Sequence, residues 1–111
     1  MNKIIGHFDE LNWYGEVTLD GKVLSPHKSQ RFRNHSPDGF AWGFAGSGPA
    51  QLALAILLET SPVQMALAYY QRFKSEFLVN LDRANFEIEV DIKTWLRKQV
   101  EMDAASLEEM S

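Results

Sequence analysis

Residues 35 to 58 read HSPDGFAWGFAGSGPAQLALAILL, and this stretch joins a glycine-rich half to a continuous apolar half. Glycine permits backbone angles and close approaches that a Cβ atom forbids. The aromatic residues of the first half alternate with small ones, which predicts a strand over 40–44. The second half has apolar side chains on nearly every side, which predicts a helix over 49–59 that is buried in the core.

Two interpretations apply to the start of that helix. Helix N-termini present unpaired N–H groups and partial positive charge, so Gly46, Ser47 and Gly48 are candidates for binding a small anion. The alternative is an ordinary turn in which Ser47 or Gly48 caps its own helix. Pro49 then takes the first helical position, and Gln51 completes a capping box. The segment lacks the lysine of a Walker loop and the spacing of a dinucleotide fingerprint.

The N-terminal part of the chain predicts a β-hairpin. Strands are expected over 3–8 and 13–19, because apolar and polar residues alternate there. Asp20-Gly21 is typical of a two-residue turn, since both residues tolerate positive φ. The return strand is expected over 22–24, and residues 26–39 are expected to form a loop.

The C-terminal part predicts mostly helix. Ser61-Pro62-Val63-Gln64 supplies an N-cap, a first-turn proline and a capping-box glutamine, which predicts a second helix. Alternation over 86–90 predicts another strand, a third helix is expected over 92–101, and the acidic residues 103–111 predict a frayed tail. Because strands precede helices, we expect an α+β fold in which a small antiparallel sheet with an N-terminal hairpin packs against two or three helices.

Length and composition limit the classes of function. At 111 residues the chain predicts one domain, residues 1–102, ahead of the tail. The absence of cysteine excludes disulfides and cysteine-based zinc sites. A formal charge of −4 disfavours generic DNA binding. The N-terminal acids do not fit a signal peptide, and the longest apolar run is far shorter than the ~20 residues of a membrane span. We therefore expect a cytoplasmic protein without a cofactor.

The loop ahead of residue 40 holds candidate polar groups. Arg33 and His35 are placed to complete a phosphate or carboxylate cradle at the helix start. His35 is also a candidate base toward Ser36 or Ser47, but a Ser-Pro-Asp-Gly turn with a histidine bonded to the backbone explains the same residues. Because no third orienting residue is evident, no catalytic residue is predicted. The three histidines follow no spacing typical of metal ligands, so no metal site is predicted.

Aromatic and acidic side chains offer two further candidate surfaces. Seven aromatic residues are candidates for lining a pocket, although such residues are more often core: Trp13, Phe40, Trp42, Phe44, Tyr69, Tyr70 and Phe73. Of these, Trp42 is the one expected to touch a partner. Six acidic residues could imitate nucleic acid toward a basic protein, or form a solvated face: Glu87, Glu89, Asp91, Asp103, Glu108 and Glu109.

The chain also resembles a family known only as a domain of unknown function, number 6166. The resemblance rests on DGKVL, RNHSPDGFAWGF, GSGPAQLALAIL, YQRFKSEFL and the later TWL. Such proteins are small, have a single domain and occur in bacteria, archaea and mobile elements, including phages. Ala41 and Phe44 stand where the family is expected to carry an acid and a tyrosine. Any catalytic acid of the family at that position is absent here.

Two functions remain open. The first is a non-catalytic interaction protein of phage or mobile-element origin that binds a host protein, a class that includes anti-defence proteins. The second is a phosphate- or nucleotide-binding domain, with or without enzymatic activity, whose site is the helix start at 46–49. Either is compatible with a homodimer. The candidate binding residues are Arg33, His35, Ser36, Trp42, Gly46, Ser47 and Gly48. Their convergence on one cavity would favour the ligand, and their use in internal hydrogen bonds would favour the interaction.

Overall fold

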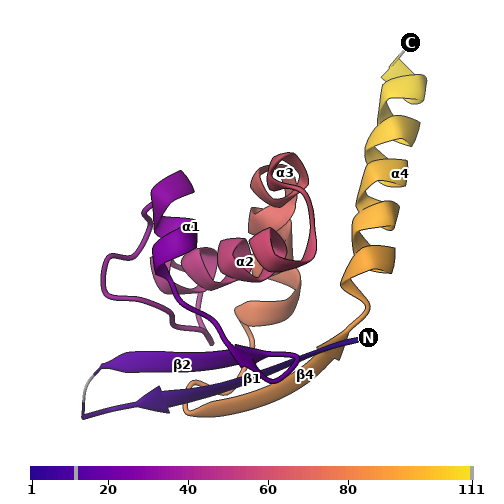
Figure 1. The fold of residues 1–111 in the computed structure, drawn as a ribbon. Coiled ribbons are helices and arrows are strands. Elements are labelled where there is room, and N and C mark those ends of the chain that lie inside the picture. The colour runs from indigo at the N-terminus through magenta and orange to yellow at the C-terminus, as the bar shows by residue number, and fades with distance from the viewer. Residues whose placement is uncertain (12, 111) are drawn as a thin grey trace.

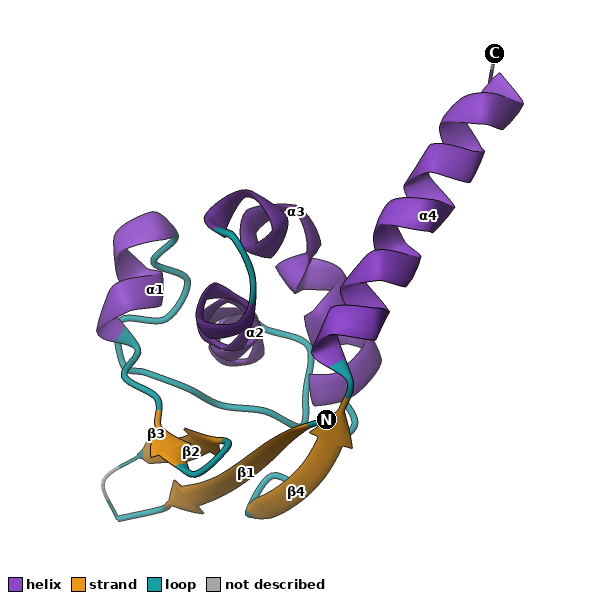
Figure 2. Cartoon of the chain, turned by 45° about the vertical axis from the view of Figure 1, so that its right-hand side comes forward, coloured by secondary structure: helices purple, strands orange, loops and turns teal. Residues whose placement is uncertain are grey.

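The computed structural model describes residues 1–11 and 13–110. These residues form two layers, an antiparallel sheet and a set of helices that covers one face of it (Figures 1 and 2). The expected α+β class is therefore confirmed. The last helix leaves the sheet and projects past the other helices, which gives the molecule an elongated shape of 53 × 26 × 23 Å.

The sheet contains the strands β1 (Asn2–Asp9), β2 (Tyr14–Leu19), β3 (Lys22–Val23) and β4 (Asn85–Val90). Their order is β3-β2-β1-β4, and β1 pairs antiparallel with both β2 and β4. The last strand in sequence thus lies beside the first, and Asn2 at the start of β1 pairs with Val90 at the end of β4. Alternate residues of β1 point toward the helices and toward solvent, so one face of the sheet is open.

The turn between β2 and β3 follows the sequence prediction. Asp20 and Gly21 have φ values of 51° and 84°, as a two-residue hairpin turn requires. The Asp20 carboxylate also accepts hydrogen bonds from the Asn2 side chain and from the Lys3 backbone, both at 2.8 Å. The bond from the Lys3 backbone is the main cause that lowers the pKa of Asp20. Hydrogen bonds to β1 therefore stabilise this turn in addition to the backbone preferences of its own two residues.

The helical layer contains α1 (His27–Phe32), α2 (Ser47–Thr60), α3 (Val63–Phe73), the π-helix η1 (Lys74–Leu78) and α4 (Ile92–Met110). Figure 2 shows α2 in the centre of this layer, over the sheet and between α1 and α3. The helix α2 is buried along almost its whole length, as its apolar sequence predicts. A helix covered on every side has no need of a polar face.

Two segments before α2 differ from the sequence prediction. The expected loop over 26–39 contains α1, and the Pro26 carbonyl accepts a hydrogen bond from the buried Ser29 hydroxyl at 2.8 Å. The expected strand over 40–44 is reduced to one isolated bridge at Phe40. Gly43 has a φ of 83°, which turns the chain out of an extended path and ends any ladder.

The helix ends also differ from the expected ones. The helix α2 begins at Ser47 rather than at Pro49, and Gly46 occupies the N-cap without a side-chain hydrogen bond. Pro49 is thus not the first helical residue, and Gln51 forms no capping box. Proline and glutamine are tolerated within the first helical turns, so these residues alone do not fix the starting position.

The helices α3 and α4 show the same kind of difference. The Ser61 hydroxyl donates back to the Leu57 carbonyl of α2 at 2.7 Å, so it does not cap α3. The helix α4 continues to Met110, through the segment predicted to be a frayed tail. Asp103 lies in that segment and accepts hydrogen bonds from Arg72 and Tyr69 of α3, at 2.9 and 3.0 Å. The helix therefore extends beyond its predicted end at residue 101, and the contacts of Asp103 with α3 lie in this additional part.

Candidate functional site

The loop that was predicted to carry a site is organised by Gln51, which is completely buried. Its side-chain oxygen accepts hydrogen bonds from the backbone N–H groups of His35 and Ser36, at 2.8 and 3.0 Å. Its side-chain nitrogen donates to the Ser29 hydroxyl at 2.7 Å and to the Arg33 carbonyl at 3.0 Å. A side-chain amide has two donors and two acceptor lone pairs, so its hydrogen-bonding capacity is filled. Gln51 therefore fixes the loop and offers no free group to a ligand.

The polar side chains of the same loop have partners other than the predicted ones. The His35 imidazole bonds to the Tyr70 hydroxyl, with 2.7 Å between nitrogen and oxygen. The exposed Arg33 guanidinium donates to the neighbouring Phe32 carbonyl at 3.2 Å. Within the described ranges, no hydrogen bond joins Ser47 to Arg33 or His35. Arg33 and His35 thus bond to Phe32 and Tyr70 in this conformation, and not to Ser47 as the candidate cradle or a histidine–serine pair would require.

Gly46 and Gly48 are explained by close packing at the start of α2. A Cβ atom on Gly48 would lie 2.6 Å from the Cβ atom of Ala41, and one on Gly46 would lie 2.7 Å from the Phe44 ring. Real carbon atoms do not approach this closely without a structural shift. Both glycines thus let α2 pack directly against the 40–44 segment.

Trp42, which was expected to touch a partner, is instead a core residue. Its side chain is 1% exposed, and its indole N–H donates to the Asp82 carbonyl at 2.8 Å. The ring lies edge-to-face against Phe86, with 4.8 Å between centroids. Gly15 also lies close to the ring, since an added Cβ atom there would be 2.6 Å from it. Segments distant in sequence cover this side chain, so Trp42 is not the exposed residue that contact with a partner led us to expect.

An open cleft of about 1270 Å³ lies where the β1–β2 turn faces the 36–44 segment and the turn before β4. We call it the aromatic cleft. The aromatic side chains that line it are Phe8, Trp13, Phe40, Trp42 and Phe44. The polar residues that line it are Glu10, Ser36, Asp38, Asp82 and Arg83. Ser36 and Trp42, two of the candidate binding residues, line this cleft. So do Trp13, Phe40 and Phe44, which the sequence offered with Trp42 as candidates for lining a pocket.

Trp13 is the most unusual residue of the aromatic cleft. Its side chain is 77% exposed, and its backbone has a φ of 52°, which a bulky residue rarely adopts. Its ring lies edge-to-face with Phe8 at 6.2 Å between centroids, and Phe8 lies edge-to-face with Trp42 at 6.3 Å. A line of rings thus runs from the surface into the core.

Arg83 and Phe44 form another part of the aromatic cleft. The Arg83 guanidinium lies over the Phe44 ring, with 5.0 Å between its central carbon and the ring centroid. Its Nε donates to the Gly43 carbonyl at 3.4 Å. This geometry is a cation–π contact, in which the negative face of the ring attracts the charge.

Sequence reasoning missed the charged residues of the aromatic cleft. They come from three separate segments, 8–13, 36–44 and 82–84, and no local pattern connects them. Trp13 was named only as one of seven candidates for lining a pocket, and its position after the polar segment DELN was a local signal for its exposure. Polar residues of this kind are typical of a turn, where side chains face solvent.

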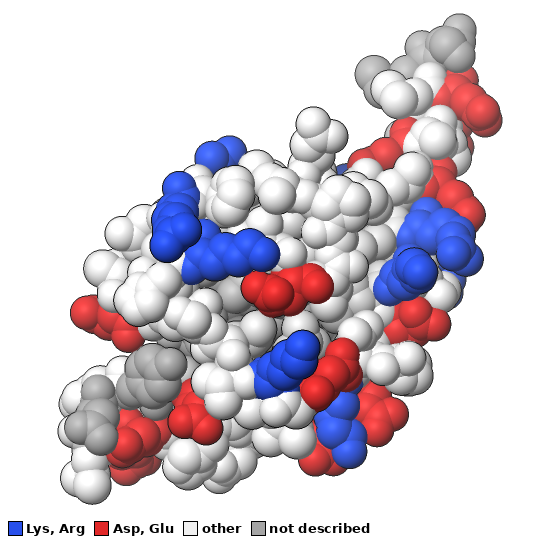
Figure 3. Space-filling model, in the orientation of Figure 1, with Lys and Arg blue, Asp and Glu red and all other residues white. Residues whose placement is uncertain are grey.

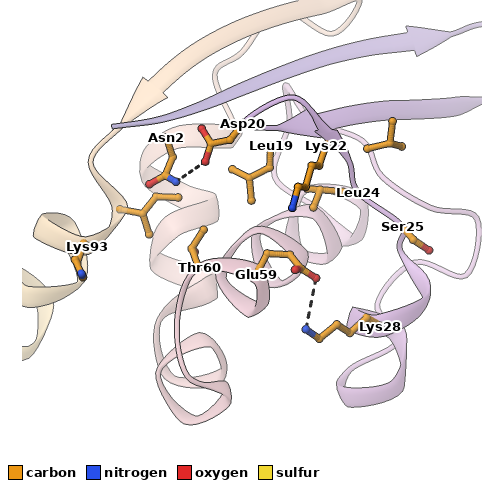
Figure 4. Close-up of a pocket in the computed structure, with 12 residues that line it drawn as sticks. Asn2, Leu19, Asp20, Lys22, Leu24, Ser25, Lys28, Glu59, Thr60 and Lys93 are labelled. Carbon is orange, nitrogen blue, oxygen red and sulfur yellow. Dashed lines mark hydrogen bonds and ion pairs between the residues drawn. The ribbon is translucent and has the colours of Figure 1, made fainter.

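A second cavity of about 630 Å³ lies between the β2–β3 turn, the C-terminal end of α2 and the start of α4 (Figure 4). Three lysines line it, Lys22, Lys28 and Lys93, and all three are exposed. Lys28 forms an ion pair with Glu59 at 3.5 Å, and in Figure 4 Lys93 lies apart from the other lysines. The cavity therefore lacks a converging set of groups.

Surface charge is mixed on the face shown in Figure 3, where acidic and basic side chains are interspersed with uncharged ones. The acidic residues predicted as a nucleic-acid mimic lie on different elements. Glu87 and Glu89 are exposed on β4, whereas Asp91 accepts hydrogen bonds from the backbone and hydroxyl of Thr94 at the start of α4. Asp103, Glu108 and Glu109 lie on α4, so the candidate acidic residues are divided between β4, the start of α4 and the rest of that helix.

The described residues contain neither a cluster of metal-ligand side chains nor a membrane-spanning helix. Across residues 1–11 and 13–110, no three histidine, aspartate or glutamate side chains lie close enough together to hold a metal ion. In the same part of the chain, no helix has both the length and the apolar character needed to cross a bilayer.

The fold and the aromatic cleft define a small α+β domain with an open, partly charged groove at one end of its sheet. A family model described as "Family of unknown function (DUF6166)" matches residues 13–98. This match covers more than half of the chain, so the protein belongs to that family, and the resemblance noted in the sequence is confirmed. No curated protein and no solved structure matches the chain.

Proposed function

We propose that the protein is a non-catalytic interaction module that binds a segment of another protein in the aromatic cleft. Trp13 is the observation that carries this proposal, because it combines 77% exposure with a positive φ. A left-handed backbone costs a non-glycine residue about 1–2 kcal/mol. Such unfavourable features persist where function requires them.

The energetic gain from covering Trp13 supports a protein partner. Aromatic side chains bury about 150–250 Å² each, and burial of apolar surface stabilises by about 25 cal/mol per Å². Covering the exposed part of one tryptophan is therefore worth on the order of 3 kcal/mol. Exposed tryptophan and neighbouring polar groups are also the usual composition of an interaction hot spot.

The competing phosphate site has less support. The backbone of His35 and Ser36 is bonded to Gln51, and the His35 ring is bonded to Tyr70. Neither of the two cavities described above is lined by Arg33, His35 or Ser47. A helix N-terminus without converging side chains is a common feature of folds and does not by itself favour a ligand.

A random peptide display library tests this function. Peptides selected on the immobilised protein are expected to lose at least about tenfold in affinity for Trp13→Ala, because their main contact is removed. Leu11→Ala is the matched control, since Leu11 lies in the same turn and is 93% exposed. Peptides that bind Trp13→Ala as well as the native protein would contradict the proposal.

The broader biological expectations are part of the same proposal. A phage or mobile-element origin, a host protein as partner, an anti-defence role and a cytoplasmic location follow from the family resemblance and the composition. A homodimer stays a prediction of the same kind. Mass measurement of native complexes isolated from the source cells would identify a partner or a second copy of the chain.

A further inference from the structure

The charges around the aromatic cleft limit what it can recognise, and we infer that its partner segment presents an arginine side chain that stacks on Trp13. This inference rests on the proposed function and adds the chemical class of the recognised group. Three carboxylates line the cleft, those of Glu10, Asp38 and Asp82, against the single guanidinium of Arg83. An approaching cation is therefore attracted, and an approaching acidic segment is repelled.

The three carboxylates differ in whether they already accept hydrogen bonds within the protein. Asp82 accepts hydrogen bonds from the backbone N–H groups of Ala84 and Asn85, at 2.8 and 3.3 Å, which hold it in place. In residues 1–11 and 13–110, no hydrogen bond or ion pair to the side chains of Glu10 and Asp38 is present. These two carboxylates are thus available to an incoming cation.

The cleft already contains one example of the inferred contact. Arg83 stacks on Phe44 and donates to a backbone carbonyl, so a guanidinium and an aromatic ring are compatible with this environment. Among the described residues, no cation lies over the ring of Trp13. Tryptophan is the strongest cation–π acceptor of the aromatic residues. The most favourable ring of the cleft is therefore the one without an internal cation.

Arginine fits this arrangement better than lysine. A guanidinium is planar, so it stacks on an indole ring while its N–H groups stay directed outward to carboxylates. The Trp13 ring and the carboxylates of Glu10 and Asp38 line the same cleft and supply both kinds of partner. A lysine ammonium is more strongly hydrated and makes less of the stacking contact.

The same random peptide library separates this inference from the proposed function. Selected peptides are expected to be enriched in arginine and to lose about tenfold in affinity for the double variant Glu10→Gln/Asp38→Asn. The matched control is Glu87→Gln/Glu89→Gln, which removes the same charge from the open face of the sheet, and it should retain binding. Replacing the peptide's arginine by lysine should weaken binding severalfold, and Trp13→Phe should retain part of it.

Each outcome decides between the two claims. Peptides that need Trp13 but contain no arginine, or that bind Glu10→Gln/Asp38→Asn normally, would overturn the inference and leave the proposed function standing. Equal losses in both double variants would also overturn it, because the effect would then be one of net charge. The absence of any peptide that depends on Trp13 would overturn both. Thermal unfolding of each variant excludes loss of the fold as the cause.

Discussion

Gln51 and Trp13 both depart from the usual distribution of side chains, but in opposite directions. Gln51 is a polar side chain placed at 0% exposure, and four hydrogen bonds fill its capacity. Trp13 is a large apolar side chain left at 77% exposure on a backbone with positive φ. Hydrogen bonds inside the protein compensate fully for the burial of Gln51. No comparable contact among the described residues compensates for the exposure of Trp13.

This difference separates a structural residue from a functional candidate. A buried polar group that finds all its partners specifies one conformation and contributes to stability. An exposed apolar group on an unfavourable backbone contributes little to stability, so its compensation is expected from outside the molecule. Substitutions at Gln51 should therefore mainly lower the free energy of unfolding, whereas substitutions at Trp13 should mainly lower the affinity for a partner.

The largest effect is expected at Gln51. Gln51→Ala leaves the buried Ser29 hydroxyl and the backbone groups of Arg33, His35 and Ser36 without this partner, and it also leaves a cavity. We expect the free energy of unfolding to fall by about 3 kcal/mol, measured by urea denaturation. Gln64→Ala, at an exposed position of α3, is the control. Equal costs for both variants would show that the buried network has no special role.

A smaller effect is expected where the aromatic cleft meets the core. Gly15→Ala would place a Cβ atom 2.6 Å from both the Phe40 carbonyl oxygen and the Trp42 ring. Because backbone and core ring must both shift, we expect a loss of about 2 kcal/mol in chemical denaturation. Gly21→Asn is the control, since nothing lies within 4 Å of that position and asparagine tolerates its positive φ. A neutral Gly15→Ala would mean that this packing is loose.

At Trp13 the expected change in stability is smaller still. Trp13→Ala loses the ring contact with Phe8, but most of the removed surface was already exposed. We expect the free energy of unfolding to change by less than about 1 kcal/mol, while peptide binding is lost. Parallel measurements of unfolding and binding on one preparation give both values. A loss of stability close to that of Gln51→Ala would show that Trp13 is a structural residue, which would contradict the proposed difference between the two positions.

The smallest effect is expected from the contact between α3 and α4. A hydrogen bond from Arg72 and a second from Tyr69 lower the pKa of Asp103 from its usual value of 3.8. A carboxyl group whose pKa is lowered by folding stabilises the protein above its unfolded pKa, and this stabilisation is lost as the pH falls through the folded pKa. Asp103→Asn should therefore lower the melting temperature slightly at pH 7 and flatten its decline below about pH 4.

A second variant, Arg72→Ala, checks the pH experiment independently. Arg72→Ala removes the other partner of the ion pair and should flatten the same part of the melting curve. If the curves for the native protein and Asp103→Asn differ only by a constant offset, the contact does not contribute to acid unfolding. The distal part of α4 would then be ordered without help from this carboxylate.

The fold could be predicted from the sequence where the signal was local. Asp20-Gly21 specified a hairpin turn because its backbone preference acts within two residues, and the structure has that turn. The 40–44 segment has the same alternation as a strand, but Gly43 turns the chain and only Phe40 pairs. An alternating sequence shows that the two faces of a segment would differ, but it does not show whether a partner strand lies beside that segment.

The candidate site could be predicted only in part. Ser36 and four of the seven candidate aromatic residues, Trp13, Phe40, Trp42 and Phe44, do line the aromatic cleft. Trp42 does so as a buried wall. Glu10 and Arg83 were not named, since each looks like an ordinary surface charge in its own segment, and Asp38 was noted only as part of a Ser-Pro-Asp-Gly turn. Their common position depends on three chain segments meeting at one end of the sheet.

The sequence by itself determined that α2 is buried, because the segment from Gly48 to Leu58 is apolar or small at every position except Gln51 and has no polar face. It also determined the hairpin and the α+β class, which depend on local preferences and on the order of the elements. Only the tertiary structure decided which tryptophan is covered. Trp42 is enclosed by Gly15, Phe86 and Asp82, whereas Trp13 stays 77% exposed beside Phe8. Burial is a property of what surrounds a side chain, and for these two residues the surroundings come from distant parts of the chain.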